Sequence, residues 1–177
     1  MFVYRSKNFY NMRMRIKQRN KIFDLWVPRS LAIMYVWGKG LGLFAGRNFK
    51  KGETVTCFRA DIVPCAHASD ESVQIDERRC FDTKWLTPEA FINHGCAPST
   101  MLDVHGYRYV ALRNIKKNEE ITFDYLTTDW DLGRQAFRCR CGAKNCYGVV
   151  RGFKYLTHRQ QERIKPHALP YLLEKIR

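Results

Sequence analysis

Three cysteines lie close together near residue 140, and they are the residues best placed to do chemistry. Cys139, Cys141 and Cys146 put three thiols within one short stretch that also contains a glycine. Structural Zn²⁺ takes four tetrahedral nitrogen or sulfur ligands, and closely spaced thiolates supply most of such a site. The spacing therefore predicts a metal site that needs one more ligand. The candidates elsewhere in the chain are Cys57, Cys65, Cys80, Cys96 and the histidines.

Two other segments combine polar and aromatic side chains. In the segment 93–96, an Asn, a His and a Cys suit hydrogen bonding or metal ligation, although a lone His is more often structural. In the segment 120–126, a strand would place Ile121, Phe123 and Tyr125 on one face, because side chains alternate along a strand. That arrangement directs two aromatic rings at one site, or it forms an ordinary core strand with a hydrogen-bonded Tyr.

A cluster of glycines matches a dinucleotide-binding pattern in letters only. Residues 40–45 read G-x-G-x-x-A, and Asp61 follows at a suitable distance. That fingerprint must open a helix, and the glycines at 46 and 52 leave no room for one. We therefore reject a Rossmann fold and expect these glycines to let the backbone approach a ligand closely.

The elements that must position these residues are mostly short strands. The patterns predict strands near 31–37, 54–58, 72–75, 107–111 and 120–126. A Thr-Pro pair at 87–88 begins a helical turn, and Thr157 with Gln160 forms a capping box for a short helix that Pro166 and Pro170 interrupt. Closely spaced strands with little room for crossover helices predict a mostly β fold.

The charge of the chain is concentrated at its two ends. The net charge is +14, and residues 1–30 carry eight Lys or Arg against one Asp, whereas residues 31–150 are nearly balanced. Residues 151–177 carry seven Lys or Arg against two Glu. We expect two basic arms that either contact polyanions such as nucleic acid or simply keep the protein soluble.

Cysteine usage and hydrophobicity limit the class of protein. Seven cysteines without a secretory segment favour a reduced, intracellular protein with some thiols on a metal over a disulfide framework. The longest uncharged apolar run, 31–37, is too short to cross a bilayer, so we expect no membrane partner. The basic start resembles a mitochondrial presequence faintly, and a plain basic arm is the better interpretation.

In chain order, four segments resemble the SET-domain protein lysine methyltransferases with a post-SET zinc-binding cysteine motif. The four segments are 38–45 (GKGLGLFA), 93–98 (NHGCAP), 119–125 (EEITFDY) and 137–148 (FRCRCGAKNCYG). The resemblance implies a SET-domain β-clip fold of small sheets with a pseudoknot. It also implies four parts: a basic N-terminal extension over 1–29, a SET domain over 30–136, a post-SET zinc cap over 137–153, and a basic, partly helical C-terminal tail over 154–177.

The resemblance also assigns an activity and the residues that perform it. It implies transfer of methyl groups from S-adenosylmethionine to lysine side chains of another protein, with histone tails the commonest substrates of the family. The catalytic pair would be Tyr125 and Phe123, and Phe123 at the family's Phe/Tyr switch position implies di- or trimethylation. The cofactor-binding residues would be Lys39, Gly40, Leu41, Asn93, His94, Tyr125 and Val149. The zinc ligands would be Cys96, Cys139, Cys141 and Cys146.

Some residues depart from the family pattern. Gly95 and Ser99 replace a Ser and an Asn, which would loosen that turn and put substrate preference in doubt. A basic histone tail would need acidity in the groove, for which we consider Asp70, Glu71, Asp76 and Glu77. The alternatives to an enzyme are an inactive SET-like module that binds chromatin or nucleic acid and a zinc domain that scaffolds a partner. A eukaryotic member would reside in the nucleus, and another in the cytoplasm.

Overall fold

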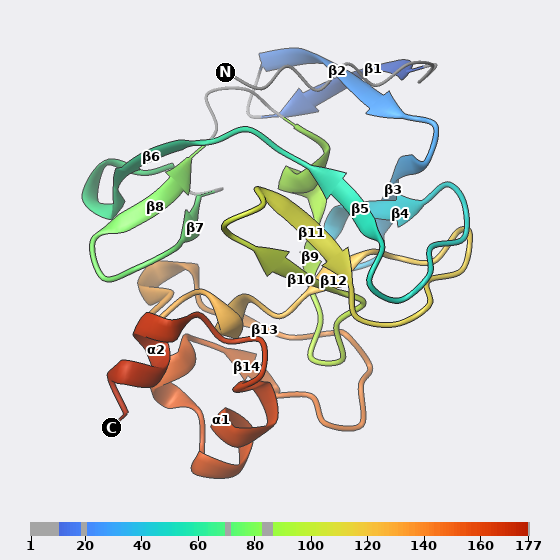
Figure 1. The fold of residues 1–177 in the computed structure, drawn as a ribbon. Coiled ribbons are helices and arrows are strands. Elements are labelled where there is room, and N and C mark those ends of the chain that lie inside the picture. Colours follow the sequence, from blue (N-terminus) through green and yellow to red (C-terminus); the bar gives the residue numbers. More distant parts are fainter. Residues whose placement is uncertain (1–10, 19–20, 70–71, 83–86, 177) are drawn as a thin grey trace.

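The protein is built mainly from short strands in small sheets (Figure 1). The computed structural model describes residues 11–18, 21–69, 72–82 and 87–176. The strands are β1 (Asn11–Gln18), β2 (Lys21–Pro28), β3 (Leu31–Val36), β4 (Gly40–Ala45), β5 (Thr54–Cys57), β6 (Asp61–Pro64), β7 (Val73–Gln74), β8 (Arg79–Asp82), β9 (Asn93–His94), β10 (Thr100–Asp103), β11 (Arg108–Ala111), β12 (Thr122–Phe123), β13 (Phe137–Arg138) and β14 (Val149–Val150).

The helical elements are short. They are η1 (Cys65–His67), η2 (Pro88–Phe91), η3 (Tyr125–Thr127), η4 (Gly133–Gln135), η5 (Phe153–Tyr155), α1 (His158–Ile164) and α2 (Pro170–Glu174). The predicted capping box at the start of α1 is present, and α2 begins at a proline, as expected. The predicted mostly β fold is confirmed. No helix in the described part of the chain is long and apolar enough to span a membrane.

The N-terminal region is more than a basic arm. β1 and β2 form an antiparallel hairpin, and β2 alternates so that Leu25 and Val27 are buried while Trp26 between them is 57% exposed. This hairpin was not predicted from the sequence, because its many Lys and Arg residues mask a period-2 pattern only a few residues long. Residues 1–10 lie outside the described part.

Two short strands far apart in the sequence lie side by side and form the centre of the fold. β12 pairs in parallel with β9, so that Thr122 is opposite Asn93 and Phe123 is opposite His94. Parallel neighbours need a long crossover connection, and here the β10–β11 hairpin lies within it. This pairing brings the 93–96 and 120–126 segments together.

The predicted strand over 120–126 is wrong in its second half. β12 ends at Phe123 because the Asp124 carboxylate accepts a hydrogen bond from the Leu126 N–H, at 3.0 Å, and thereby caps the 3₁₀ turn η3. Tyr125 therefore begins a turn instead of continuing the strand. Its ring still lies against that of Phe123, with ring centroids 4.7 Å apart.

The core has two parts. The larger collects buried side chains from β2 through β12, and the smaller collects those of the C-terminal third: Leu126, Val150, Phe153, Ile164, Leu169, Tyr171 and Leu172. The C-terminal segment thus packs against the domain through α1 and α2, and its basic residues lie on the outer surface of a folded region.

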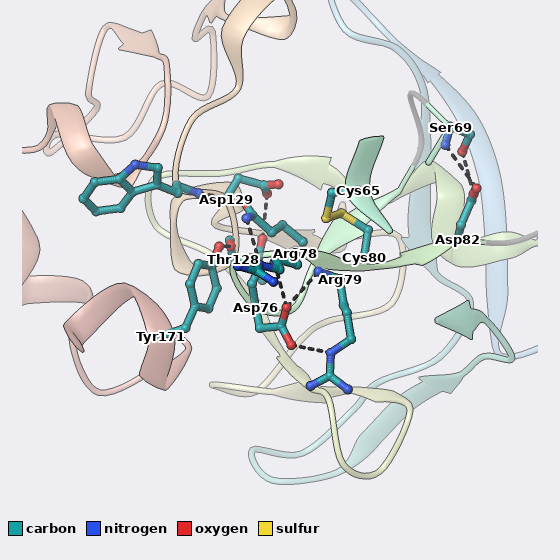
Figure 2. Close-up of a disulfide and its surroundings, with 12 residues drawn as sticks. Cys65, Ser69, Asp76, Arg78, Arg79, Cys80, Asp82, Thr128, Asp129 and Tyr171 are labelled. Carbon is teal, nitrogen blue, oxygen red and sulfur yellow. Dashed lines mark hydrogen bonds and ion pairs between the residues drawn. A yellow bond between two sulfur atoms is a disulfide. The ribbon is translucent and has the colours of Figure 1, made fainter. Parts of the chain in front are cut away.

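A disulfide joins Cys65 to Cys80 in the β6–β8–β7 sheet (Figure 2). The expectation that all cysteines are reduced is therefore wrong for these two. β6 pairs with β8 so that Val63 is opposite Cys80, and this register brings Cys65, the residue that follows β6, within bonding reach of Cys80. Registers of this kind cannot be read from cysteine spacing alone.

Candidate active site and metal centre

The four cysteines expected to bind zinc lie together. The Sγ atoms of Cys96, Cys139, Cys141 and Cys146 all lie within 4.8 Å of one another. Cys96 Sγ is 3.7 Å from Cys139 Sγ and 3.9 Å from Cys146 Sγ. A tetrahedral centre with Zn–S bonds of ≈ 2.3 Å separates its sulfurs by about 3.8 Å. The donor set and its spacing therefore fit a Zn²⁺ ion.

Backbone groups around the cluster are arranged to stabilise thiolates. The Tyr147 N–H donates to Cys96 Sγ and the Gly148 N–H donates to Cys146 Sγ, each at 3.4 Å. Burial raises the pKa of the Cys96 thiol, and a bound cation would displace that proton. Of the other candidates for the fourth ligand, two form the disulfide and Cys57 is exposed outside the cluster.

His94 connects the cysteine cluster to Tyr125. Its Nδ1 accepts a hydrogen bond from the Tyr125 backbone N–H at 3.3 Å, which leaves the proton of a neutral ring on Nε2. Nε2 lies 3.2 Å from Cys96 Sγ. Burial, aided by the charge of Lys39, lowers the pKa of His94 to about 4, so the ring is neutral at physiological pH.

Tyr125 is held in a fixed orientation. Its hydroxyl donates a hydrogen bond of 2.9 Å to the Ile92 carbonyl, and its ring meets those of His94 and Phe123 with centroids 5.4 and 4.7 Å away. Burial raises the pKa of Tyr125 above its usual range, and the hydroxyl therefore stays protonated. Its chemistry is that of a positioned hydrogen-bonding group rather than a base.

A polar network fastens the β3–β4 turn to β9. Lys39 Nζ lies 2.6 Å from one Glu120 oxygen, and Asn93 Nδ2 donates to the other at 3.0 Å and to the Leu41 carbonyl at 3.2 Å. Gly42 is necessary here, because a Cβ atom at this position would lie 2.8 Å from Asn93 Nδ2. Gly42, one of the two glycines that imitated a dinucleotide motif, thus permits this close approach.

A cavity of about 320 Å³ opens beside this network, and we call it the Arg-lined cavity. Its lining residues are Gly38, Lys39, Asn93, His94, Tyr125, Phe137, Arg138, Cys139 and Arg140. Purines stack on flat aromatic rings, and carboxylates accept hydrogen bonds from guanidinium groups. S-adenosylmethionine contains both a purine and a carboxylate. The lining fits that cofactor.

The predicted cofactor residues divide into two groups. Lys39, Asn93, His94 and Tyr125 line the Arg-lined cavity, whereas Gly40, Leu41 and Val149 do not. Val149 is 47% exposed and lies in β14, where it pairs with Arg138. Sequence reasoning did not identify Phe137, Arg138 and Arg140, although their position beside the cysteine motif was an available signal.

A second cavity, of about 170 Å³, is also lined by Tyr125, and we call it the acid-lined cavity. Its lining residues are Ser72, Val73, Glu89, Ala90, Ile92, Tyr109, Phe123, Tyr125, Asp129, Leu132 and Gln135. Tyr125 is the residue that both linings share, and Phe123 belongs to this one alone. Glu89 and Asp129 could not be identified from the sequence, because neither lies in a motif.

The two departures from the family pattern fit tightly and do not loosen the turn. A Cβ atom at Gly95 would lie 2.8 Å from the Thr122 hydroxyl, so glycine permits the close approach of β9 and β12. The hydroxyl of Ser99 is fully buried and accepts a hydrogen bond from the Thr122 N–H at 2.9 Å. The expected loosening is therefore wrong.

Comparison with known proteins identifies the domain that carries this site. The family model of the SET domain matches residues 40–126. A methyltransferase of Aspergillus flavus, flvH, is 36% identical over 64 residues, which are 35% of this chain and 35% of that protein. Human histone-lysine N-methyltransferase 2B is 31% identical over 133 residues, which are 60% of this chain and 5% of that protein.

A solved structure has the same fold. The structure of KRYPTONITE with mCHH DNA, an H3(1-15) peptide and SAH has a TM-score of 0.54 and 25% identity, and the match covers 67% of this chain and 29% of that one. The chain thus spans about a third or less of the length of these three proteins. The matched region contains β9, β12 and Tyr125, which together position both cavities. Residues 40–126 of this chain are a SET domain.

Proposed function

We propose that this protein transfers methyl groups from S-adenosylmethionine to lysine side chains of another protein. The observation that carries this proposal is the single tyrosine, Tyr125, shared by the Arg-lined and acid-lined cavities. A methyl group passing directly from donor to acceptor needs two compartments that meet at one point. The named activities of the SET-domain relatives support the same reaction.

The Arg-lined cavity is the proposed cofactor site. S-adenosylmethionine, when bound, supplies a methyl group activated by its sulfonium charge. Arg138 and Arg140 would bind its carboxylate, because the third cation of the lining, Lys39, is already paired with Glu120. Phe137 and His94 offer ring faces to the adenine. Of the cofactor-binding residues that the family resemblance predicts, we keep Asn93 and the others that line this cavity as proposed cofactor contacts.

The acid-lined cavity is the proposed lysine channel. Tyr109, Phe123 and Tyr125 form aromatic walls, and a narrow channel of this kind excludes water from the entering side chain. Lysine has a reference pKa of ≈ 10.4, and removal from water favours the neutral amine that must attack. The Tyr125 hydroxyl, fixed by the Ile92 carbonyl, would align amine and methyl.

The proposal extends to the metal, the product and the partners. We propose that the four cysteines bind Zn²⁺, because a tetrahedral thiolate site is typical of that ion. Phe123 puts no hydroxyl into the channel wall, which supports di- or trimethylation. A histone tail is our proposed substrate, with non-specific nucleic acid contact through the basic ends. In a eukaryote such a protein would act in the nucleus.

A transfer assay tests the proposed reaction. Purified protein is incubated with S-adenosylmethionine labelled in the methyl group and with the four core histones and a whole-cell lysate as acceptors. We expect label on lysine side chains, with peptides beyond the monomethyl form in mass spectra. Tyr125→Phe should lose most of the label, whereas Tyr155→Phe, which changes an exposed tyrosine, should not. Absence of labelled lysine with every acceptor would refute the proposed function.

A further inference from the structure

Two carboxylic acids face the aromatic walls of the acid-lined cavity. Glu89 comes from η2 and Asp129 from the residues just after η3, so they enter the lining from different parts of the chain. Both act electrostatically on the phenol of Tyr109, and Asp129 acts also on that of Tyr125. The acids therefore lie close to the tyrosine at which the two cavities meet.

Glu89 has an unsatisfied oxygen. Its Oε1 atom is buried and has no hydrogen-bond partner among the residues that the structure describes. A buried polar atom without a partner costs stability and is normally satisfied in a native protein. Burial raises the pKa of this carboxyl group above that of a solvent-exposed glutamate.

Asp129 is half-buried, and its neighbours include three tyrosines. The Thr128 hydroxyl donates to it at 2.7 Å, and the titratable groups that face it are the phenols of Tyr109, Tyr125 and Tyr171. Burial raises the pKa of Asp129 to about 7. Within the described ranges, neither Asp129 nor Glu89 forms an ion pair with a Lys or Arg.

Two of the four acids considered from the sequence for this role are already paired. Asp76 binds Arg79, and Glu77 binds Lys175, so their charges are neutralised within the protein (Figure 2 shows the first pair). Asp70 and Glu71 lie outside the described residues. Among the described residues that line the acid-lined cavity, the acids are Glu89 and Asp129.

We propose that Glu89 and Asp129 form a receptor that captures the target lysine as its ammonium ion and then accepts its proton. This inference rests on the proposed function and adds to it the groups that recognise the cation. Capture forms charge-assisted hydrogen bonds to oxygens that otherwise lack a cationic partner. In the proton transfer, an N–H bond breaks, its electron pair stays on nitrogen as the attacking lone pair, and a carboxyl O–H bond forms.

The local environment favours that proton transfer. In a water-excluded aromatic cavity, a neutral amine beside a neutral carboxylic acid costs less than two separated charges. Mono- and dimethylated lysine are also cations with an N–H bond, so the receptor serves each later transfer as well. The proton returns to solvent when the product leaves.

Binding of a lysine side-chain analogue tests the receptor without any methyl transfer. The probe is n-butylammonium, titrated by NMR into the full chain in the presence of S-adenosylhomocysteine, with n-butanol as the uncharged analogue of equal length. Removing two charge-assisted hydrogen bonds should weaken n-butylammonium binding by about 10- to 100-fold in the double variant Glu89→Gln, Asp129→Asn. Binding of n-butanol should not change.

Matched variants make the outcome decisive. Asp131→Asn, which removes a nearby acid that pairs with Lys154 outside the cavity, should bind n-butylammonium as the wild type does. Each single variant, with folding checked by S-adenosylhomocysteine affinity, should show part of the loss if the double variant does not fold. Equal n-butylammonium affinity in wild type and variants would overturn the receptor, and so would failure of the wild type to bind it.

A kinetic measurement tests the proton-accepting role separately. If the wild type methylates lysine, Asp129→Asn should lower kcat near pH 7 and recover as the pH approaches the pKa of free lysine, ≈ 10.4. Glu89→Gln and Asp129→Asn should change kcat/KM for the acceptor and leave the KM for S-adenosylmethionine unchanged. A kcat deficit that is the same at every pH would contradict proton acceptance.

Discussion

The two cavities that meet at Tyr125 differ in charge and in how the chain builds them. The Arg-lined cavity contains Lys39, Arg138 and Arg140 and takes part of its wall from the cysteine-rich segment. The acid-lined cavity contains Glu89 and Asp129 and takes its wall from η2 and from the segments beside the disulfide-bonded sheet. Under the proposed function, this difference would direct the cofactor carboxylate to the Arg-lined cavity and the lysine ammonium group to the acid-lined cavity.

The largest expected effect should fall on the Arg-lined cavity alone. Cys146→Ser removes one thiol of the metal cluster, and structural zinc sites contribute on the order of 10 kcal/mol of binding free energy. We expect loss of bound zinc, measured by elemental analysis, and loss of S-adenosylhomocysteine binding, measured by calorimetry, because the cluster positions Phe137 through Arg140.

The matched control is Cys57→Ser, which changes a free, exposed cysteine outside the cluster. It should keep both zinc and cofactor affinity. A Cys146→Ser protein that has lost its zinc but binds S-adenosylhomocysteine normally would break the link between the metal and the Arg-lined cavity.

The next effect concerns the residue that both cavities share. Tyr125→Phe removes the hydroxyl that donates to the Ile92 carbonyl and leaves the ring in place. We expect kcat to fall by about 100-fold, equivalent to about 2.7 kcal/mol of transition-state stabilisation. S-adenosylhomocysteine and n-butylammonium should bind with unchanged affinities. Near wild-type turnover would show that the hydroxyl has no part in alignment.

The next prediction concerns the free energy of unfolding and the sheet beside the acid-lined cavity. We expect a loss of stability there without a loss of cofactor binding. Cys65→Ser opens the disulfide to Cys80, whose sequence separation is 15. Closing a loop of that length stabilises a protein by about 3 kcal/mol. Urea titrations should therefore show a lower midpoint for this variant, and also for the wild type in reductant. At urea concentrations below the unfolding transition, the affinity for S-adenosylhomocysteine should be unchanged. Identical midpoints with and without reductant would argue against the disulfide.

The smallest effect is a pH dependence that originates in the acid-lined cavity. The pKa of Asp129 is about 7 in the folded protein and 3.8 for the free side chain, so between these values the folded state holds a proton that the unfolded state has lost. The free energy of unfolding should therefore fall as pH rises from about 4 to 7, and Asp124, with a pKa of about 6, contributes with the same sign.

The Asp129→Asn substitution should remove part of this pH-dependent fall in the free energy of unfolding. At pH 7.5 the variant should be more stable than the wild type by on the order of 1–3 kcal/mol. Urea denaturation of both proteins at several pH values measures the difference between their free energies of unfolding. Any effect of metal loss at low pH is common to both proteins and cancels in this difference. A difference that does not change with pH would mean that Asp129 is ionised in the folded protein.

Sequence reasoning succeeded where the chemistry lies in motifs and failed where it depends on tertiary packing. The four cysteines that the structure brings together and the position of Tyr125 beside a cavity could be anticipated, because these residues lie in short, dense patterns that resemble a family. Glu89 and Asp129 are single acids in unremarkable surroundings, and only the folded chain brings them to one cavity. The mostly β fold followed from strand patterns, whereas the Cys65–Cys80 bond depends on a register that only pairing reveals.

The most direct test of the account is a crystal structure of the protein with both S-adenosylhomocysteine and n-butylammonium. The account predicts the sulfur of the first in the Arg-lined cavity and the nitrogen of the second between Glu89 and Asp129, with the Tyr125 hydroxyl between them. Cofactor density away from Tyr125, or an amine bound anywhere except the acid-lined cavity, would contradict it.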